Sequence, residues 1–575
     1  MRLVNFNVGE VTTQLIDGAE VRTGYLKAPA AQPWMITAAG AEGDHVAVHP
    51  DHLYVFDRAS YDFWARELAV DRSSWPDGFF AENLTVDTID QTVLHVGDML
   101  EVGGAQLVVT GPRVPCWKLS WRLGQPKTFI RRFRTSGRSG VYLGVRRPGA
   151  VGPGDSLTVV EQARGNPTVA EVARLGADRD LTPEDVGTVE RALACPDLSL
   201  TVRMMLTLTM TDIDRRRNRR TQRWAGWRPF LVDDPVSEST GVYSFSLRPA
   251  DGAALPTPEP GQHVAVRLGA EGTEPVVRTW SLSEHAEEPP RYRITVRELP
   301  GSVGVPRLLT AASAGTTVHL RAPGGSFRLD LTGFRPVVLI AAGTGISPLM
   351  AMAQAHVRRG AAAPPLWLFY GTRNATEAPL WEALARIAGD RPDVHLFSFR
   401  SRPNEDLLNR TAVLGRISAA TVIQSLQGNY LRLGSGTMPA PWFETDVYIC
   451  GPGQFNADIR DGLLAAGANA DQVHTEQFSA SYPIGASTGH ADDARVRFVA
   501  SGLEVDWIAA ENRTLLELGE DHGLTLPSYC RSGSCHTCEA RIVRGTVDGA
   551  IVTGADHRAL LCSSYPASEQ VWLDI

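Results

Sequence analysis

The sequence predicts a multidomain chain of mixed α+β and α/β class. With 575 residues, the chain is too long for a single hydrophobic core. Short alternating runs separated by turn residues lie near its start, as in small β-rich domains. Farther along, a near-continuous apolar run at 336–341 leads into a glycine-rich loop, which is typical of a buried parallel strand in a doubly wound sheet.

The composition is that of an ordinary globular protein. It is 43% hydrophobic and 21% charged with a net charge of −8, so nothing favours nucleic acid or a membrane surface as a partner. The start of the chain lacks the apolar core of a signal peptide. The most apolar window, 336–353, is interrupted by two glycines and a proline. We therefore expect a cytoplasmic protein. Its expected partner is a small-molecule substrate.

The first 222 residues are expected to hold a β-barrel-like domain over 1–165 and a helical tail with a linker over 166–222. Runs such as 51–56 and 105–110 are typical of strands. Thr182, followed by a proline and two acids, is typical of a helix start. A basic run at 215–220 is typical of a helix end that leads into a solvated linker.

Cys116 lies in a proline-rich turn after one of these strands, where a buried structural thiol would be the ordinary interpretation. The segment 111–119 nevertheless resembles the cysteine motif of MOSC domains, named for the C-terminal domain of molybdenum-cofactor sulfurase. Three further pieces carry the resemblance: 80–85, 96–98 and 136–143. The subgroup it resembles includes the hydroxylaminopurine-resistance proteins, whose three-helix appendage is similar to the helical tail. The resemblance implies that Cys116 is a catalytic residue that ligates molybdenum of the molybdenum cofactor.

One stretch departs from that family pattern. The family usually carries His-Gly-Gly followed closely by Asp-Lys, a segment that helps to hold the pterin. Here the matching stretch is His49-Pro50-Asp51-His52, without the glycines or the lysine. The family's Phe-Gly-Glu-Asn is Phe-Ala-Glu-Asn at 80–83.

Residues 223–332 are expected to form a flavin-binding β-barrel. By itself, the run Arg278-Thr279-Trp280-Ser281 would be an ordinary strand, but it resembles the R-x-[YF]-S flavin motif of the ferredoxin-reductase superfamily. The resemblance implies that Trp280 covers the isoalloxazine, that Ser281 hydrogen-bonds the flavin ring and that Arg278 pairs with the flavin phosphate. Val305 stands where relatives often have a phosphate-contacting serine. FAD and FMN therefore both stay open, with FAD preferred.

Residues 333–482 are expected to form a doubly wound nucleotide-binding domain. Gly343, Thr344 and Gly345 follow the apolar run, and Ser347 can cap the next helix with Pro348 at its first position. A glycine loop that leads into a helix N-terminus suits a pyrophosphate. No acid directly follows the second apolar strand to hold a ribose hydroxyl, so NADH and NADPH both stay open.

A later apolar run at 447–450 ends in Cys450, Gly451 and Pro452. A buried strand thiol would be the ordinary interpretation of this cysteine. The three residues resemble the C-G-P motif on the nicotinamide side of the ferredoxin-reductase superfamily. The resemblance implies that Cys450 lies by the nicotinamide ring.

The last region, 490–575, carries Cys530, Cys535, Cys538 and Cys562. Their spacing, C-x4-C-x2-C…C, is that of a plant-type ferredoxin, so all four are predicted ligands of a [2Fe–2S] cluster. A zinc site would usually show two C-x2-C pairs, and a chain without a signal peptide is a poor candidate for disulfides. The order of flavin, nicotinamide and cluster motifs over 225–575 resembles the phthalate dioxygenase reductase family, which implies a β-grasp fold for the last domain.

Together these motifs predict an NAD(P)H-dependent flavin and iron–sulfur oxidoreductase. A hydride carries two electrons and the cluster accepts one, so a flavin must stand between them. The resemblances imply a self-sufficient reductase that passes electrons to a molybdenum cofactor at Cys116 and reduces N-hydroxylated or N-oxide substrates. In the alternative, 225–575 serves a separate oxygenase partner and 1–220 is a metal-free binding module. A sulfur- or cofactor-carrier role for the first domain is a third option.

Overall fold

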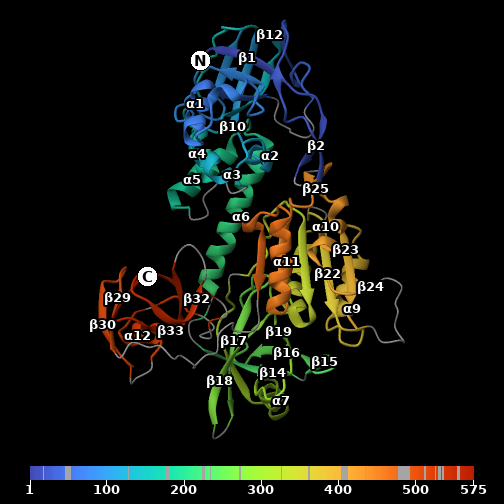
Figure 1. Cartoon of the computed structure of the whole chain (residues 1–575), viewed down its shortest axis with the longest axis vertical. Helices are drawn as coiled ribbons and strands as arrows, with labels where there is room; N and C mark the ends of the chain where they lie inside the picture. The colour runs from blue at the N-terminus through green and yellow to red at the C-terminus, as the bar shows by residue number, and fades with distance from the viewer. Residues whose placement is uncertain are drawn as a thin grey trace. The chain divides into compact units, whose positions relative to one another are not determined.

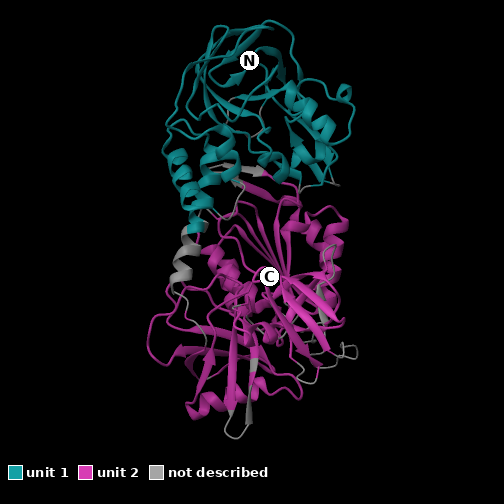
Figure 2. Cartoon of the chain, turned by 90° about the vertical axis from the view of Figure 1, so that its left-hand side faces the viewer, with its two compact units in different colours: residues 1–218 teal, residues 219–575 magenta. Residues whose placement is uncertain are grey.

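The chain folds into two compact units, residues 1–218 and 219–575 (Figure 2). The structure is a computed structural model. It describes all residues except the following: 17–18, 46–52, 127–128, 177–180, 223, 225–226, 234, 271–272, 326, 361–362, 403–411, 434–435, 477–492, 510–512, 525, 529–532, 534–535 and 553–556. The stretch His49-Pro50-Asp51-His52 lies outside the described residues, and so do Cys530 and Cys535.

The first unit is built on a curled eight-stranded sheet. Its strands, in spatial order, are β13 (Thr158–Glu161), β9 (Met99–Val102), β10 (Ala105–Pro112), β11 (Val141–Arg147), β7 (Leu53–Asp57), β8 (Leu84–Val86), β1 (Leu3–Val8) and β4 (Ala28–Pro29). Smaller elements are β2 (Thr12–Ile16) with β3 (Ala19–Thr23), and β12 (Gly149–Val151) with β5 (Trp34–Thr37) and β6 (Gly40–Ala41). The strand predicted at 105–110 is confirmed as β10. The run predicted at 51–56 is strand β7 from residue 53 onward, and residues 51–52 lie outside the described residues.

The core of this unit follows from the alternation along β7. Leu53 and Val55 face one aliphatic cluster, and Tyr54 and Phe56 face a separate aromatic cluster, because successive strand side chains point to opposite faces. Trp64 belongs to the aromatic cluster. Three helices lie beside it: α1 (Arg58–Glu67), α2 (Trp117–Arg122) and α3 (Phe129–Thr135). The aromatic layer thus holds α2, the helix that follows Cys116, against the sheet.

A helical tail follows the sheet. It comprises α4 (Val169–Leu175), α5 (Pro183–Ala194) and α6 (Leu200–Gln222), which pack together through Val172, Val189 and Val202. Thr182 caps α5 and a proline occupies its first turn, as predicted. The basic run at 215–220 falls in the last turns of α6.

The second unit begins with a curled antiparallel sheet, the predicted barrel. The main path runs through β15 (Val236–Ser239), β16 (Val242–Pro249), β14 (Arg228–Val232), β20 (Thr317–Leu320), β17 (His263–Ala270) and β18 (Thr273–Ser281), while β19 (Tyr292–Arg297) pairs with β16. A bridge between Leu282 and Ile294 joins the end of β18 to β19 and curls the sheet toward closure. Helix α7 (Gly304–Ala314) packs on β14 and β17.

A six-stranded parallel sheet follows, which confirms the predicted doubly wound fold (Figure 1). Its order is β24 (Ala412–Leu414), β23 (Val394–Arg400), β22 (Leu366–Thr372), β21 (Val337–Ala342), β27 (Asp446–Cys450) and β28 (Val473–Glu476). Four helices accompany it: α8 (Ile346–Val357), α9 (Trp381–Gly389), α10 (Ala419–Ser425) and α11 (Gly453–Ala465). Helix α8 packs with α9, and α10 packs with α11.

The predicted start of α8 is wrong. The turn after β21 is a 3-10 helix, η2 (Gly343–Gly345), which runs directly into α8, so Gly345 and not Ser347 is the N-cap. Pro348 accordingly lies inside the first turn rather than at its first position. The hydroxyl of Ser347 instead donates to the carbonyl of Thr295 at 3.2 Å and to that of Thr344 at 2.9 Å.

The chain ends in a mixed sheet with helix α12 (Leu515–Asp521) packed on it, as expected for a β-grasp fold. Its strands, in order, are β30 (Leu503–Ile508), β29 (Asp493–Phe498), β34 (Gln570–Asp574), β31 (Glu539–Arg544), β33 (Arg558–Pro566) and β32 (Val547–Val552). Strands β29 and β34 pair in parallel. Throughout the part of the chain that the structure describes, no helix is both long and apolar enough to cross a membrane.

Candidate functional site

The order of the parallel sheet defines a crevice at its centre. From β21 the chain proceeds outward through β22 and β23, and it later returns on the other side with β27 and β28. Open α/β sheets bind nucleotides at such a reversal of strand order, beyond the carboxyl ends of the strands. Gly343, Thr344 and Gly345 lie at this end of β21, and Cys450 ends β27 with Gly451 and Pro452 directly after it.

The two loops at this crevice are in close contact. A Cβ added to Gly345 would lie 2.1 Å from the backbone oxygen of Cys450. The structure therefore brings together the two groups of residues that the sequence assigns to the nicotinamide nucleotide, and Gly345 is the residue that permits this approach.

The end of β18 meets this crevice through a carboxylate that sequence reasoning missed. The hydroxyl of Ser281 donates to Oε2 of Glu476 at 3.2 Å, and Nδ1 of His263 lies 3.8 Å from the other carboxylate oxygen. Glu476 is the register partner of Cys450 across β27 and β28. Burial, together with the charge of Glu476, raises the pKa of the Cys450 thiol well above its usual value. The predicted flavin and nicotinamide residues thus face each other around Glu476.

The end of β22 also holds an acid that sequence reasoning did not place there. Glu377 turns back onto the loop, where Nδ2 of Asn374 donates to its carboxylate at 3.0 Å and Nη1 of Arg373 lies 3.4 Å away. This edge offers a carboxylate, which suits a ribose hydroxyl, and a guanidinium, which suits a ribose phosphate. NADH and NADPH are therefore not distinguished by the sign of the charge at this edge.

The residues present fit a flavin phosphate at the start of α7. An added Cβ on Gly304 would lie 3.7 Å from the Arg278 side chain and 3.1 Å from the indole of Trp280, so all three groups converge. No side chain caps α7, and a free helix N-terminus beside a guanidinium suits an anion. The hydroxyl oxygen of Thr279 is buried and has no hydrogen-bond partner within the described residues, so it is available to a ligand.

Replacing Arg278 by alanine is expected to weaken flavin binding about tenfold to a hundredfold, because a charge-assisted hydrogen bond is worth about 1.5–3 kcal/mol. Flavin retention after dialysis, followed by visible absorbance, measures the effect. The matched control is Arg248→Ala, because Arg248 lies on β16 of the same sheet and, among the described residues, forms an ion pair with Asp233 alone on the surface. Equal flavin content in both variants would remove Arg278 from the flavin site.

Two of the four predicted cluster cysteines lie in the described residues, and they are neighbours. The backbone N–H of Cys562 donates to the sulfur of Cys538 at 3.5 Å, and that of Gly533 donates to the sulfur of Cys562 at 3.2 Å. Gly533 has a φ of 73°, a conformation that glycine adopts without strain. Amides directed at thiolate sulfurs are one of the means by which a protein tunes an iron–sulfur cluster.

Cys562→Ala is expected to abolish the paramagnetic signal of the reduced [2Fe–2S] cluster and to lower the iron content from two atoms per chain, since the cluster needs four thiolates. Iron analysis and electron paramagnetic resonance measure this. Cys195→Ala is the control, because Cys195 is also buried but lies in the helical tail. A Cys562→Ala protein that keeps two irons and the signal contradicts the assignment.

Cys116 is half-buried at the start of α2, and a buried cation lies beside it. The side chain of Arg113 is 4% exposed and donates to the hydroxyls of Tyr25 at 2.8 Å and Tyr54 at 3.1 Å. Burial raises the pKa of Tyr25 to about 12, so this phenol is neutral near pH 7. Among the described residues, no carboxylate lies within ion-pair distance of Arg113. Its charge is therefore not balanced by an acid.

A second buried polar group lies near this cation. Nζ of Lys27 lies 2.5 Å from the carboxylate of Asp44, which also accepts from Nδ2 of Asn83 at 2.8 Å. Burial lowers the pKa of Lys27. Glu82 is fully buried, and burial raises its pKa. Lys27 is already paired with Asp44. Of these two buried cations, Arg113 is therefore the one that could bind an anionic ligand.

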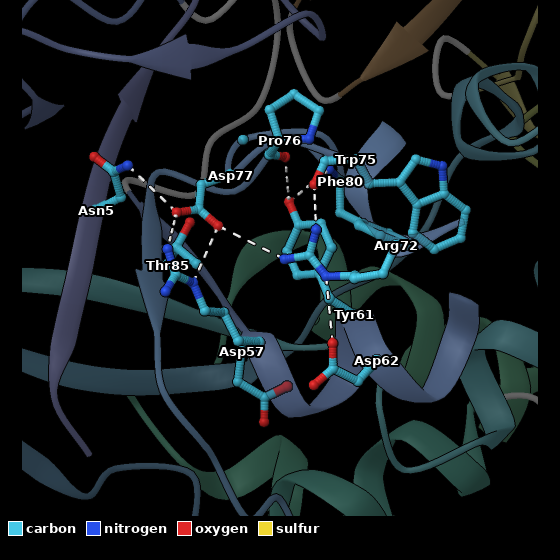
Figure 3. A network of polar contacts seen from close by, with 12 residues as sticks. Asn5, Asp57, Tyr61, Asp62, Arg72, Trp75, Pro76, Asp77, Phe80 and Thr85 are labelled. Carbon is cyan, nitrogen blue, oxygen red and sulfur yellow. Dashed lines mark hydrogen bonds and ion pairs between the residues drawn. The ribbon is translucent and has the colours of Figure 1, made fainter. Parts of the chain in front are cut away.

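The segment 75–82 that borders this group is fixed by a polar network (Figure 3). The guanidinium of Arg72 donates to the carbonyl of Trp75, and the hydroxyl of Tyr61 donates to that of Pro76 at 3.2 Å. Asp77 accepts from Arg58 at 2.7 Å. The backbone N–H of Phe80 donates to the hydroxyl of Tyr61 at 3.5 Å, so the backbone on both sides of residue 79 is held in place.

Comparison with known proteins assigns three domains. Residues 42–158 match the model of the MOSC domain, 339–461 that of the oxidoreductase NAD-binding domain, and 501–567 that of the 2Fe-2S iron-sulfur cluster binding domain. The chain therefore contains all three, in the predicted order. The subgroup within the MOSC domains remains a prediction.

Several known proteins are similar to the part of the chain that holds the NAD-binding and 2Fe-2S domains. A flavohemoprotein of Rhizobium meliloti (strain 1021) is 29% identical over 280 residues, which are 47% of this chain and 64% of that protein. The stachydrine N-demethylase reductase subunit of the same organism is 26% identical over 56% of this chain and 88% of its own length. A solved structure of phthalate dioxygenase reductase, 24% identical, covers 61% of this chain and 98% of its own, with a TM-score of 0.42. The chain spans less than two thirds of the flavohemoprotein's length.

Proposed function

We propose that this chain, whose second unit is an NAD(P)H-dependent oxidoreductase module for a flavin and a [2Fe–2S] cluster, is a self-sufficient reductase. Its electrons would end at a molybdenum cofactor held by Cys116, where an N-hydroxylated or N-oxide substrate is reduced. The presence of a MOSC domain and an electron-delivery module in one chain supports this proposal.

The overall reaction balances without another reactant. A hydroxylamine R–NHOH, NAD(P)H and one proton give the amine R–NH2, NAD(P)+ and water. The N–O bond breaks, the nitrogen gains two electrons and NAD(P)H loses two. An N-oxide gives the tertiary amine and water in the same way. A bound flavin supplies the conversion of one hydride into two single-electron transfers.

The residues of the second unit organise the first half of this reaction. Gly345 allows the nucleotide loop to approach Cys450, so a nicotinamide in the crevice would lie against the buried thiol. Ser281 donates a hydrogen bond to Glu476 at the same place, which would provide a polar contact beside the flavin ring.

The observation that carries the molybdenum proposal is the buried guanidinium of Arg113 beside Cys116. A buried charge that no opposite charge balances costs several kcal/mol, so the site fits an anionic group. The molybdenum cofactor is such a group, because its pterin carries a phosphate and two thiolate sulfurs, and Cys116 can add a soft thiolate ligand. When bound, the cofactor supplies the ability to take an oxygen atom from nitrogen.

Elemental analysis of the full chain, made in a host that synthesises the cofactor, tests this proposal. We expect about one molybdenum and two irons per chain, since the cluster alone accounts for the iron. Iron without molybdenum would overturn the proposal.

A second candidate function is that of a reductase for a separate oxygenase. The similarity to a reductase subunit of a demethylase, of which the chain covers 88%, favours it. In that case residues 1–220 would be a metal-free docking module. Iron without molybdenum, together with fast electron delivery to an added oxygenase, is the outcome this candidate expects.

A further inference from the structure

The segment that contains Cys116 has an unusual charge. Residues 102–154 include ten arginines and lysines and no aspartate or glutamate. Acids from elsewhere in the first unit pair with some of them: Arg132 with Glu67, Arg146 with Asp197, and Arg147 with Glu101. The cations nearest Cys116 in the sequence are Arg113, Lys118 and Arg122.

Arg122 is one of these cations. It is the last residue of α2, whose N-cap is Cys116, and it is half-buried. Burial lowers its pKa, and the ionisable groups that act against this effect are the phenols of Tyr25 and Tyr61. Its Nε is buried without a hydrogen-bond partner, and no carboxylate lies within ion-pair distance of its guanidinium within the described residues. Arg122 and Arg113 therefore both lie near Tyr25, and neither forms an ion pair with an acid of the described residues.

The position of Arg122 is set by an aromatic platform. Its guanidinium lies 4.3 Å from the centroid of the Phe79 ring. That ring stacks on Trp75 at 5.3 Å, and the surrounding segment is held by the network of Figure 3. A guanidinium that stacks through its face keeps its edge N–H groups for a ligand. The charge is thus held in one place before any ligand arrives.

The two arginines differ in depth. Arg113 is almost completely buried at the base of the Cys116 loop, which suits a resident cofactor, whereas Arg122 is partly open to solvent. Arg122 follows Cys116 by six residues, which is a rise of about 9 Å along the axis of an α-helix. Both groups lie close enough to the phenol of Tyr25 to interact with it electrostatically. A small molecule whose N–O group lies at Cys116 could therefore reach the guanidinium with its other end.

We propose that Arg122 is the specificity-determining residue of the Cys116 site and that the substrate reduced there carries a carboxylate or a phosphate. The proposal rests on the proposed function, because it assumes that the N–O group is reduced at Cys116. It adds the class of substrate: an N-hydroxylated or N-oxide compound whose anionic group lies at the end opposite its N–O bond.

Two matched probes test this: benzamidoxime, which is neutral, and 4-carboxybenzamidoxime, which carries a carboxylate opposite its N–OH group. Each is converted to the amidine and water with one NAD(P)H and one proton. The wild-type chain is expected to prefer the carboxylate probe in kcat/KM. Arg122→Met, which keeps the packing on Phe79 but removes the charge, should lower kcat/KM for that probe about tenfold to a hundredfold and leave the neutral probe unchanged. For the carboxylate probe, kcat/KM of Arg122→Lys should lie between that of the wild type and that of Arg122→Met.

The control is Arg131→Gln, an exposed cation of the same segment on α3, which should change neither probe. Equilibrium binding of both probes to the oxidised chain without NAD(P)H, followed by tryptophan fluorescence, gives a second readout. In this binding experiment, Arg122→Met should lower the affinity for the carboxylate probe by the same factor. Added salt should lower that affinity only in the wild type.

Three results would overturn the proposal: an equal loss for both probes in Arg122→Met, no loss for either, or a loss of molybdenum in that variant, which would make Arg122 a cofactor ligand. If the wild type reduces neither probe but still binds the carboxylate probe through Arg122, the proposed function fails and the anion site remains. If the wild type reduces both probes with no preference, the proposed function stands and the anionic substrate class is wrong.

Discussion

Replacing Cys116 by serine is expected to reduce NAD(P)H-driven reduction of an N-hydroxylated substrate to background, while ferricyanide reduction by the same protein stays unchanged. A serine hydroxyl stays protonated near neutral pH and is a poor ligand for a metal that binds a soft thiolate. Ferricyanide takes its electrons from the flavin or the cluster, which lie before Cys116 in the proposed path. Molybdenum content should fall and iron content should not.

The two assays in one variant separate catalysis from folding. A misfolded chain would lose both activities. Loss of the site at Cys116, the last in the proposed electron path, would remove substrate reduction and leave ferricyanide reduction intact. Cys195→Ala serves as the control for a thiol in the same unit, since Cys195 is buried in the helical tail and should change neither activity. If the Cys116→Ser protein keeps full substrate reduction, the molybdenum proposal fails. A reductase for a separate oxygenase is then the better-supported function.

The second large effect is expected from Gly345→Ala, which should abolish NAD(P)H-dependent reduction of every acceptor. The added Cβ would lie 2.1 Å from the backbone oxygen of Cys450, 2.5 Å from its carbonyl carbon and 2.9 Å from the nitrogen of Gly451. All three atoms belong to the backbone at the end of β27, so no side chain can move aside. The η2 turn and β27 must separate, which disrupts the nucleotide crevice.

The control is Gly389→Ala at the end of α9, where an added Cβ meets no atom within 4 Å. This change should leave activity intact, because alanine in open space costs a helix nothing. Oxidation of NADH and NADPH with ferricyanide, together with flavin absorbance, measures the outcome. Flavin should stay bound in Gly345→Ala, because the added Cβ meets the backbone at the end of β27 and not Arg278, Trp280 or Ser281. A Gly345→Ala enzyme with normal nucleotide oxidation would remove this loop from the nucleotide site.

Local patterns predicted most of the fold. The apolar run at 336–341 is a buried parallel strand because both faces of that sheet are covered, and Thr182 caps α5 because its side chain and its acidic neighbour satisfy the first helix amides. The prediction that Ser347 caps α8 is wrong, because the glycine turn η2 starts the helix earlier. The serine and proline then lie within the first turn, where the same sequence pattern also occurs.

The site was predicted only where a motif is local. The cluster cysteines and the glycine loop have fixed spacings. Glu476, by contrast, lies 195 positions from the Ser281 hydroxyl it accepts from, and Tyr25 lies 88 positions from Arg113. No periodicity in the sequence marks such pairs, because they depend on how the sheets are assembled. A single acid or tyrosine at a strand end is ordinary until the fold supplies its partner.

The hydrogen bond from Ser347 to the carbonyl of Thr295 has a thermodynamic consequence. It joins the first turn of α8 to β19, and the backbone N–H of Leu380 likewise donates to the carboxylate of Glu238 on β15. Loss of order in the antiparallel sheet would therefore leave polar groups of the parallel sheet without partners. A ligand that binds one folded sheet stabilises the other by linkage, so flavin and nucleotide should each raise the melting temperature of both sheets together.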